Sequence, residues 1–450
     1  MNFIGLDIGT TTICAVVIDS ESGNVVKTIT CENNAKLNGK IDYEKIQSPA
    51  IILEKCVEIV AEFDASFSPV ACIGITGQMH GILYLDNCGN AVSPLYFWQD
   101  ESGNRMFNKH QSYAEYLTQL TGHKMATGFG GTTLFCHTHD GAVPEDASKI
   151  CTIHDYVAMK LCGTTEPLMH TTDAASLGLF NLNTLQFDKE AIEKAGINFS
   201  LFPEVTEAFS LVGKYNNGIP VSVAIGDNQA SFLGSVNDME NSILVNVGTG
   251  SQISFLTDKT ETAEGLEIRP CFDRQFLCVG SSLCGGRAFA VLEEFLRKTA
   301  AFVTGGQIKS AYPAMDSLLT GSAQPANPLQ VSTQFSGTRN HPEGRGSVEN
   351  IGLYNFTPQH LIWGFLNGMV EELQVMYQTA GDRTRTLLIG SGNGLRKNTA
   401  LQLLFADKFG LELKIPSHGE EAAFGAALFA LTAAGYERSI FDAQKRIKYN

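Results

Sequence analysis

Two short turns rich in glycine and threonine carry residue types that bind phosphate. The first turn, Gly9–Thr12, lies between the apolar runs Phe3–Leu6 and Ile13–Ile18, a pattern that predicts a β-hairpin. A glycine lets backbone N–H groups approach a phosphate closely, and threonine hydroxyls can donate to its oxygens. Asp7, at the end of the first strand, could hold a divalent cation. Taken alone, the stretch fits an ordinary hairpin with an exposed turn equally well.

The same pattern recurs in the second half of the chain. The apolar runs Ile243–Val247 and Ser251–Leu256 flank a second turn, Gly248–Gly250. Two such hairpins predict two domains of like topology that face one nucleotide. This arrangement resembles that of the actin, Hsp70 and sugar-kinase ATPases. A polar link at 236–241 predicts the boundary, which gives domains of residues 1–236 and 237–450.

The composition limits the class of protein. The chain has 450 residues, enough for two domains that each have a core, and its 44% hydrophobic content is ordinary for a globular protein. A formal net charge of −15 argues against nucleic acid or an anionic membrane as a partner, and we attribute this charge to solubility. The charge does not exclude ATP, because such a site binds through backbone amides and a metal ion.

The cysteines indicate a reducing compartment. There are eleven, scattered without a C-x-x-C pair, and several lie in apolar runs, as Cys14, Cys56 and Cys72 do. This pattern favours reduced thiols over a disulfide scaffold or a zinc site. The first strand begins at residue 2 or 3, so we expect no signal peptide, and no run of about 18 apolar residues predicts a membrane helix. We therefore expect a cytoplasmic protein.

Polar residues follow two buried strands, at the edge where α/β sheets bind ligands. The run Val70–Ile75 leads into Gly77–Gly81, which reads Gly-Gln-Met-His-Gly. The run Val221–Ile225 leads into Gly226–Ala230, which reads Gly-Asp-Asn-Gln-Ala. Side chains at the carboxyl ends of such strands point into the ligand crevice. Asp227 is therefore a site candidate, and the alternative is that it caps the following helix.

Three other stretches have both a chemical and a structural interpretation. Trp98 could stack on a sugar and Asp100 could accept its hydroxyls, but from these residues alone a buried Trp98 in the core is favoured. The run His137–Asp140 contains metal-ligand types, and we interpret it as an exposed loop because a loop fixes no ligand geometry. His154 opens an apolar helix and is interpreted as a packing residue.

Helical periodicity and small residues predict the remaining elements that position these groups. Gly390–Gly394, after a short strand, would let adenine or ribose lie against the backbone, and the helix N-terminus that follows would favour phosphate. A stretch rich in glycine, proline and serine at 320–350 predicts a long functional or interface loop. The predicted helices are Tyr43–Phe63, Met106–Leu120, Arg287–Phe302, Pro358–Ala380 and the alanine- and glycine-rich Glu420–Ala434.

Six motifs, in this order, resemble the FGGY carbohydrate kinases over nearly the whole chain. Gly-Gln-Met-His-Gly looks like the ketose-kinase branch. Ala126–Gly130 and Thr152–Val157, with Leu161–Gly163 and Pro167–Met169, look more like the sedoheptulokinases within it. The six motifs are Asp7–Thr11, Gly77–Gly81, Trp98–Asp100, Gly226–Ala230, Val247–Gly250 and Gly390–Gly392.

The resemblance implies two actin-like (ribonuclease H-like) α/β ATPase domains with a catalytic cleft between them. It implies ATP-dependent phosphorylation of a ketose at its terminal primary hydroxyl, giving sedoheptulose 7-phosphate. The nearest alternative is a kinase for another ketose, chiefly D-xylulose. A non-catalytic sugar sensor or an actin-like ATPase is a further alternative, and a base in the crevice argues against the sensor. A homodimer is one arrangement that the sequence allows.

The resemblance also assigns roles by position. Asp227 would be the general base and Asp7 would help to hold Mg²⁺. Many family members carry a basic residue just after the first Gly-Thr-Thr, which is absent here, and Arg339 or Arg345 could supply the missing charge. The phosphate residues would be Thr10, Thr11, Gly248 and Thr249; the adenosine residues Gly390, Gly392, Asn393 and Asn398; and the sugar residues Gln78, Met79, His80, Trp98, Asp100 and Asp227.

Overall fold

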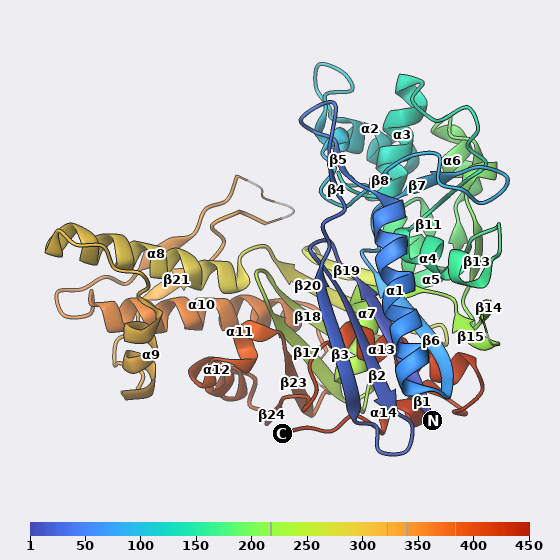
Figure 1. The fold of residues 1–450 in the computed structure, drawn as a ribbon. Helices are drawn as coiled ribbons and strands as arrows, with labels where there is room; N and C mark the ends of the chain where they lie inside the picture. Colours follow the sequence, from blue (N-terminus) through green and yellow to red (C-terminus); the bar gives the residue numbers. More distant parts are fainter. Residues whose placement is uncertain (217, 322, 339–340, 342, 383) are drawn as a thin grey trace. The chain divides into compact units, whose positions relative to one another are not determined.

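The computed structural model describes residues 1–216, 218–321, 323–338, 341, 343–382 and 384–450, and the chain forms two compact units (Figure 1). Unit 1 consists of Met1–Asn237, Arg269–Phe276 and His418–Lys448. Unit 2 consists of Asp238–Ile268, Leu277–Ser417 and Tyr449–Asn450. The two compact units therefore are not separated by one boundary between residues 236 and 237, because two later segments of the chain pack within unit 1.

Unit 1 contains most of the short strands and the smaller helices. Its strands are β1 (Asn2–Ile8), β2 (Thr12–Asp19), β3 (Val25–Glu32), β4 (Lys36–Asn38), β5 (Lys45–Gln47), β6 (Val70–Gly77), β7 (Leu83–Leu85), β8 (Leu95–Tyr96), β9 (Lys149–Cys151), β10 (Leu168–His170), β11 (Phe180–Asn181), β12 (Gln186–Phe187), β13 (Glu204–Thr206), β14 (Leu211–Tyr215), β15 (Ile219–Ser222) and β16 (Ile225–Gly226). Its helices are α1 (Pro49–Phe67), α2 (Tyr113–Thr121), α3 (Gly130–Asp140), α4 (Ile153–Cys162), α5 (Thr171–Leu177), α6 (Lys189–Lys194), α7 (Asp227–Ser235), α13 (Glu421–Ala433) and α14 (Ile440–Gln444).

Unit 2 contains the two longest helices in the described part of the chain. Its strands are β17 (Ser242–Val247), β18 (Ser251–Thr257), β19 (Leu266–Pro270), β20 (Phe276–Ser282), β21 (Gln330–Ser332), β22 (Ser347–Glu349), β23 (Leu387–Ser391) and β24 (Leu413–Lys414), of which β19 ends and β20 begins in unit 1. Its helices are α8 (Gly285–Thr304), α9 (Tyr312–Gly321), α10 (Pro358–Thr379), α11 (Asn393–Arg396) and α12 (Thr399–Phe409).

The predicted hairpin at the start of the chain forms the middle of the unit 1 sheet. Its strand order is β14-β15-β6-β1-β2-β3, and β16 also pairs with β6. Strands β1 and β2 are antiparallel, with Asp7 opposite Cys14, whereas β1 and β6 are parallel. The short strand β16 is also parallel to β6, so β1, β6 and β16 end at the same edge. This parallel trio positions the candidate site.

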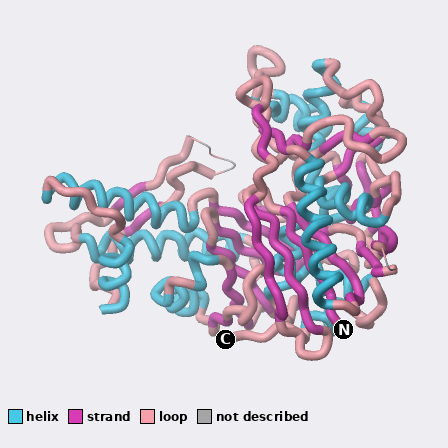
Figure 2. Tube along the Cα trace, viewed as in Figure 1, coloured by secondary structure: helices cyan, strands magenta, loops and turns pink. Residues whose placement is uncertain are grey.

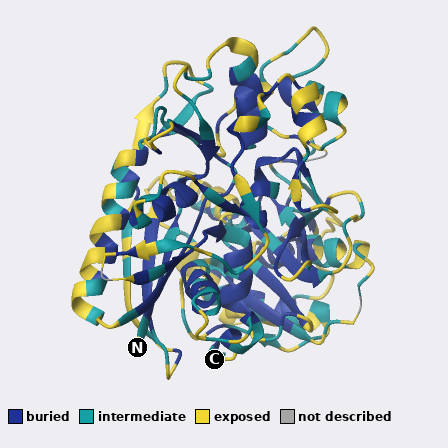
Figure 3. Cartoon of the chain, turned by 90° about the vertical axis from the view of Figure 1, so that its right-hand side faces the viewer, coloured by how far each residue is buried: buried dark blue, intermediate teal, exposed yellow. Residues whose placement is uncertain are grey.

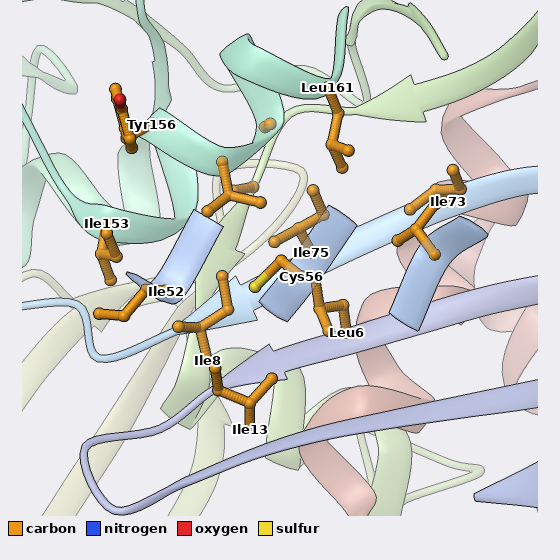
Figure 4. Packing of buried hydrophobic residues seen from close by; sticks show 14 of the residues in the cluster. Leu6, Ile8, Ile13, Ile52, Cys56, Ile73, Ile75, Ile153, Tyr156 and Leu161 are labelled. Carbon is orange, nitrogen blue, oxygen red and sulfur yellow. The ribbon is translucent and has the colours of Figure 1, made fainter. Parts of the chain in front are cut away.

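Helices cover both faces of the unit 1 sheet. Helix α1 begins at Pro49 after the N-cap Ser48 and lies across the strands (Figure 2). Its buried residues recur every three or four positions, and its other side is exposed (Figure 3). Ile52 and Cys56 of α1 join the apolar side chains of β1, β6 and α4 in one buried cluster (Figure 4).

The opposite face of the sheet contacts α13 almost backbone to backbone. Side chains alternate along a strand, so Gly5 and Gly74 face away from the cluster to which their neighbours Leu6 and Ile73 belong. A Cβ at Gly5 would lie 1.8 Å from the carbonyl oxygen of Ala423, and one at Gly74 would lie 1.9 Å from that of Ala426. The alanine- and glycine-rich composition of α13 therefore serves close packing.

Unit 2 repeats the hairpin in a six-stranded sheet of order β19-β20-β18-β17-β23-β24. Strand β17 is antiparallel to β18 and parallel to β23, with Asn246 opposite Ser391. Apolar residues of β17, such as Val245, share a buried cluster with α8, α10 and α12. The second predicted hairpin is thus confirmed. Within the described residues, no helix has the length and apolar character needed to cross a membrane.

Three predicted elements are wrong in extent or kind. Helix α1 starts at Pro49, because Lys45–Gln47 pairs as strand β5 and Ser48 caps the helix. Helix α2 starts at Tyr113, where Ser112 and Glu115 form a capping box. The run His137–Asp140 is the last turn of α3, which ends at Gly141 in the left-handed conformation, and not an exposed loop. His137 is buried there, and its Nδ1 lies 2.8 Å from the hydroxyl of Tyr84.

The burial of His137 predicts a pH-dependent stability on the acid side. Burial lowers the pKa of His137 to about 4, whereas the unfolded side chain titrates at about 6.5. The unfolded chain therefore takes up the proton first, and this residue alone costs up to about 3 kcal/mol of stability as the pH falls from about 6.5 to about 4. We expect His137→Asn to flatten this part of the pH profile in urea unfolding. His139→Asn, at a half-exposed site on the same helix, should keep the wild-type slope.

Candidate active site

Three parallel strand ends bring the predicted catalytic and sugar residues to one edge of unit 1. In β1, Asp7 lies opposite Thr76 of β6, and Gly77 of β6 lies opposite Gly226 of β16. Gln78, Met79 and His80 follow β6 directly, and Asp227 follows β16. The N-cap of α7 is Gly226, without a side-chain cap, so the alternative that Asp227 is a helix cap is wrong.

Asp7 lies within electrostatic range of two other carboxylates. Asp7 is partly buried, and burial, followed by the charges of Asp227 and Glu420, raises its pKa to about 7. Glu420 precedes α13 and has a left-handed backbone. A divalent cation removes this repulsion, and Mg²⁺ is commonly held by one or two carboxylates and by substrate phosphates. The residues present therefore fit Mg²⁺, and the sequence motifs do not predict Glu420.

A buried arginine accompanies Asp227. Burial raises the pKa of the Asp227 carboxyl, while the positive charge of Arg269 is the largest effect that lowers it. Arg269 lies at the end of β19, in the short segment Arg269–Phe276 that belongs to unit 1, and its side chain is buried. Gln229 Nε2 of α7 donates to the carbonyl oxygen of Pro270 at 2.7 Å, which ties this segment to the helix of Asp227. Sequence reasoning misses Arg269, because no motif precedes it.

The first Gly/Thr turn is tied to the sugar candidates by side-chain hydrogen bonds. The Thr10 hydroxyl donates to Gln78 Oε1 at 3.2 Å and accepts from Trp98 Nε1 at 2.8 Å. Gln47, which the sequence does not indicate, donates to the Thr10 carbonyl oxygen at 2.9 Å and accepts from Gln78 Nε2 at 2.8 Å. Because the Thr10 hydroxyl has two partners, it links the turn to Gln78 and Trp98, whereas Thr11 is exposed.

Trp98 is exposed and Asp100 is buried. Trp98 is 47% exposed, so the core interpretation is wrong, and its anchored ring is free for stacking. Asp100 is 1% exposed, and its two carboxylate oxygens accept from the backbone N–H groups of Ser102 and Lys45 at 3.0 and 3.3 Å. Asp100 therefore holds the chain around Trp98. Gly128 completes this packing, because a Cβ there would lie 2.0 Å from the Trp98 carbonyl oxygen.

Met79 lies against Gly226 of β16, whereas His80 contacts Phe129 and helix α5. Met79 is buried, and its sulfur would lie 2.8 Å from a Cβ at Gly226. The His80 ring stacks on Phe129 with centroids 4.9 Å apart, and its Nδ1 lies 2.7 Å from the Ser176 carbonyl oxygen. The stretch 126–130, which suggests the sedoheptulokinase branch, therefore contacts both Trp98 and His80.

In unit 2, the second Gly/Thr turn is bound to the start of α8. The carbonyl oxygens of Gly248 and Thr249 accept from the N–H groups of Gly286 and Arg287 at 2.9 and 3.0 Å. A Cβ at Gly285 would lie within 2.4–2.6 Å of backbone atoms of Gly250 and Ser251, so the helix can start here only with glycine. Thr249 is exposed at the tip of the turn, where it can reach a ligand.

The predicted adenosine residues divide into exposed and structural positions. Gly392 has φ +84° and lies against Val247, and the exposed Asn393 begins α11 directly after it. Gly390 instead faces the apolar side chains of Leu395 and Ile415, and Asn398 caps α12 by accepting from Leu401 N at 2.9 Å. These two residues therefore have structural contacts, and Gly390 pairs with Val245 of the second hairpin.

The arginines considered for the missing charge lie in the long loop. Arg345 is exposed and lies 3.6 Å from Glu343, and Arg339 lies outside the described residues. Among the described residues, the buried Arg269 is the cation with the largest effect on Asp227, where its charge lowers the pKa.

Comparison with known proteins decides the family. Residues 2–234 match the N-terminal domain, and residues 244–434 the C-terminal domain, of the FGGY family of carbohydrate kinases. The chain belongs to the FGGY family. Members of the family are carbohydrate kinases, so this chain is an enzyme that uses ATP as the phosphoryl donor, and the predicted resemblance is confirmed.

Individual relatives cover nearly the whole chain. The kinase is 28% identical to a sedoheptulokinase of Mus musculus over 95% of this chain and 97% of the relative, and 25% identical to a xylulose kinase of Staphylococcus xylosus over 95% and 90%. Among solved structures, a gluconate kinase from Lactobacillus acidophilus (TM-score 0.84, 18% identity) covers 100% of this chain and 92% of its own. The xylulose kinase from Rhodospirillum rubrum (TM-score 0.83, 19% identity) covers 100% and 93%. The predicted two-domain α/β fold class is thus confirmed.

Proposed function

We propose that this kinase transfers the γ-phosphoryl group of ATP to the terminal primary hydroxyl of a ketose, and that the ketose is sedoheptulose. The observation that carries the proposal is the convergence of Asp7, Gln78 and Asp227 at the ends of three parallel strands. The murine sedoheptulokinase relative and the 126–130 stretch that contacts Trp98 and His80 support the choice of ketose.

Each residue has a chemical task in this proposal. Asp227 accepts the proton of the attacking hydroxyl, and Arg269 favours the ionised form of that carboxylate against the effect of burial. Trp98 stacks on the sugar, while Gln78 and His80 bind its hydroxyls. Asp7 and Glu420 would hold Mg²⁺, and the bound ion would supply positive charge against the phosphates. In unit 2, Thr249 binds phosphate and Gly392–Asn393 binds adenosine.

The substrate is tested by measuring ADP release with Mg-ATP and sedoheptulose, D-xylulose, D-ribulose or glycerol. We expect the highest kcat/KM with sedoheptulose, and the 7-phosphate as the product identified by ³¹P and ¹³C NMR. If D-xylulose is preferred, the kinase chemistry stands and the choice of sedoheptulose is wrong. If no sugar raises ADP release above background, the carbohydrate substrate must be sought elsewhere.

Replacing Trp98 should separate sugar binding from ATP binding. We expect Trp98→Ala to raise KM for the ketose by about tenfold, the value of one aromatic contact, and to leave KM for ATP unchanged. Trp98→Phe keeps a ring but loses the bond to Thr10, so its KM should fall between the two. Initial rates at varied sugar and fixed ATP measure this, and an unchanged sugar KM in Trp98→Ala would exclude stacking.

Location and assembly stay proposals as well. The eleven cysteines, which all lie in the described part of the chain, are free thiols, and this supports a reducing cytoplasmic location. Light scattering at two protein concentrations measures the molecular mass in solution and so tests for a homodimer. A mass near that of one chain at both would exclude it.

A further inference from the structure

A buried polar cluster lies behind Asp227, and the proposed reaction gives it no task. It consists of His154 and Asp155 at the start of α4 and Asp173 in the first turn of α5, and all three side chains are buried. Each residue offers one nitrogen or oxygen that could bind a metal ion, and these three atoms lie within 4.8 Å of one another. His154 Nε2 and Asp173 Oδ1 are 2.9 Å apart. We call these three residues the His154 cluster.

The His154 cluster contacts the backbone immediately before Asp227. A Cβ at Gly226 would lie 3.3 Å from Asp173 Oδ1, and one at Gly77 would lie 3.2 Å from His154 Nδ1. Next to Asp173, the hydroxyl of Thr172 accepts from the N–H of Gly226 at 3.1 Å. The first turn of α5 therefore holds the short strand β16 from which Asp227 projects.

His154 and Asp173 have only each other as polar partners. Among the described residues, neither nitrogen of His154 and neither carboxylate oxygen of Asp173 has a partner in hydrogen-bond geometry, although His154 Nε2 and Asp173 Oδ1 lie 2.9 Å apart. Asp155 differs, because its Oδ2 accepts from the Thr152 hydroxyl at 2.7 Å. A close pair sealed from water must complete its hydrogen bonding internally.

The electrostatic cost of burying charge decides which groups of the cluster carry a proton. Two buried carboxylates near a neutral imidazole would be an uncompensated double negative charge, which is very costly without water. Burial raises the pKa of Asp173 well above its ordinary value and that of Asp155 to about 8, and burial lowers the pKa of His154. The other charged groups that act on the cluster are Asp227 of α7 and, through Asp227, Arg269 of β19.

A proton fits between the two side chains better than a metal ion does. The three residues offer three ligands in an enclosed place, whereas structural Zn²⁺ takes four and Mg²⁺ takes six, several of them waters. The separation of 2.9 Å lies within hydrogen-bond distance, so a proton placed between the two atoms can complete the bond after a small rotation of either side chain. A protonated Asp173 donates its O–H to His154 Nε2, and both groups are then neutral.

We propose that Asp173 and His154 form a neutral hydrogen-bonded pair that fixes the Gly226–Asp227 junction, so that both are positioning residues for the base. The inference rests on the proposed role of Asp227. Asparagine has the shape of a protonated aspartate and carries an N–H in place of the O–H. The pair therefore tolerates Asp173→Asn and does not tolerate Asp173→Ala.

The test compares these two variants in the full chain with Mg-ATP and the preferred ketose. We expect Asp173→Asn to keep kcat within about threefold of the wild type, and Asp173→Ala to lose about 100-fold in kcat with both KM values nearly unchanged, as a displaced catalytic group does. Thermal unfolding gives a second readout, in which only Asp173→Ala lowers Tm. If Asp173→Asn lowered kcat and Tm as much as Asp173→Ala does, the neutral pair would be excluded.

Two controls separate this inference from the proposed function. Elemental analysis of the purified wild type should find no stoichiometric transition metal, and one equivalent that is lost in Asp173→Asn would overturn the proposal in favour of a metal site. If no ketose is phosphorylated, the Tm comparison still tests the pair. If Asp227→Asn remains active, Asp227 is not the base and the positioning role fails with it, whereas the Tm difference reports on the pair alone.

Discussion

Replacing Asp227 with asparagine is expected to lower kcat by about a thousandfold and to change each KM by less than about threefold. Asparagine has nearly the shape of aspartate, so α7 and the sugar site stay in place. It cannot accept the hydroxyl proton, which must then leave to water while the phosphoryl group transfers. The result would show that the carboxylate acts in the transition state and not in substrate binding.

The experiment requires steady-state ADP release for the variant and for a matched control. Asp146→Asn removes an exposed carboxylate in the same unit and should behave as wild type. Retention of more than about a tenth of kcat in Asp227→Asn would remove the base assignment, because general bases contribute about 100-fold or more. Calorimetric binding of ATP to the variant confirms that its loss of rate is not a loss of folding.

Placing a methyl group at Gly425 is expected to prevent folding of unit 1. A Cβ at Gly425 of α13 would lie 1.8 Å from the carbonyl oxygen of Ala230 in α7, and one at Gly234 would lie 1.9 Å from that of Glu421. These neighbours are backbone atoms, so no side chain can turn aside, and the two helices must separate. We expect a loss of more than about 4 kcal/mol, the range of severe core overpacking.

Gly419→Ala provides the control for this prediction. Gly419 lies six residues earlier, and a Cβ there would meet nothing within 4 Å. Circular dichroism melts and soluble yield compare the two variants, and we expect Gly425→Ala to be insoluble or to melt far below the wild type. A Tm within a few degrees of wild type would mean that the two helices can separate at little cost.

Local patterns in the sequence predict the two hairpins and the residues that follow parallel strands. The alternation of apolar residues around Gly9–Thr12 and Gly248–Gly250 specifies strands, and strand ends in α/β sheets bind ligands. The sequence alone therefore suffices to propose Asp7, Gln78 and Asp227. The same reasoning assigns Gly390 and Asn398 to adenosine, but their packing and capping contacts depend on neighbours that a motif does not show.

Residues contributed by distant segments cannot be predicted in this way. Arg269 and Glu420 reach the neighbourhood of Asp227 and Asp7 only because Arg269–Phe276 and His418–Lys448 pack within unit 1. The start of α1 is mispredicted for a different reason, because Lys45–Gln47 takes its partner strands from elsewhere in the chain. The hydrophobicity of Trp98 favours the core, whereas in the structure the ring is exposed and its Nε1 donates to Thr10.

The position of α13 in unit 1 has a consequence for synthesis on the ribosome. Strands β1 and β6 emerge first, yet the helix that packs against Gly5 and Gly74 emerges only after all the strands of both units. Until then, one apolar face of the nascent sheet has no covering helix and is a surface for chaperones to bind. An expression fragment that ends at the family-domain boundary, near residue 236, would lack that helix for the same reason. Unit 1 therefore completes its fold only after α13 has been made, although most of its sequence is made long before that helix.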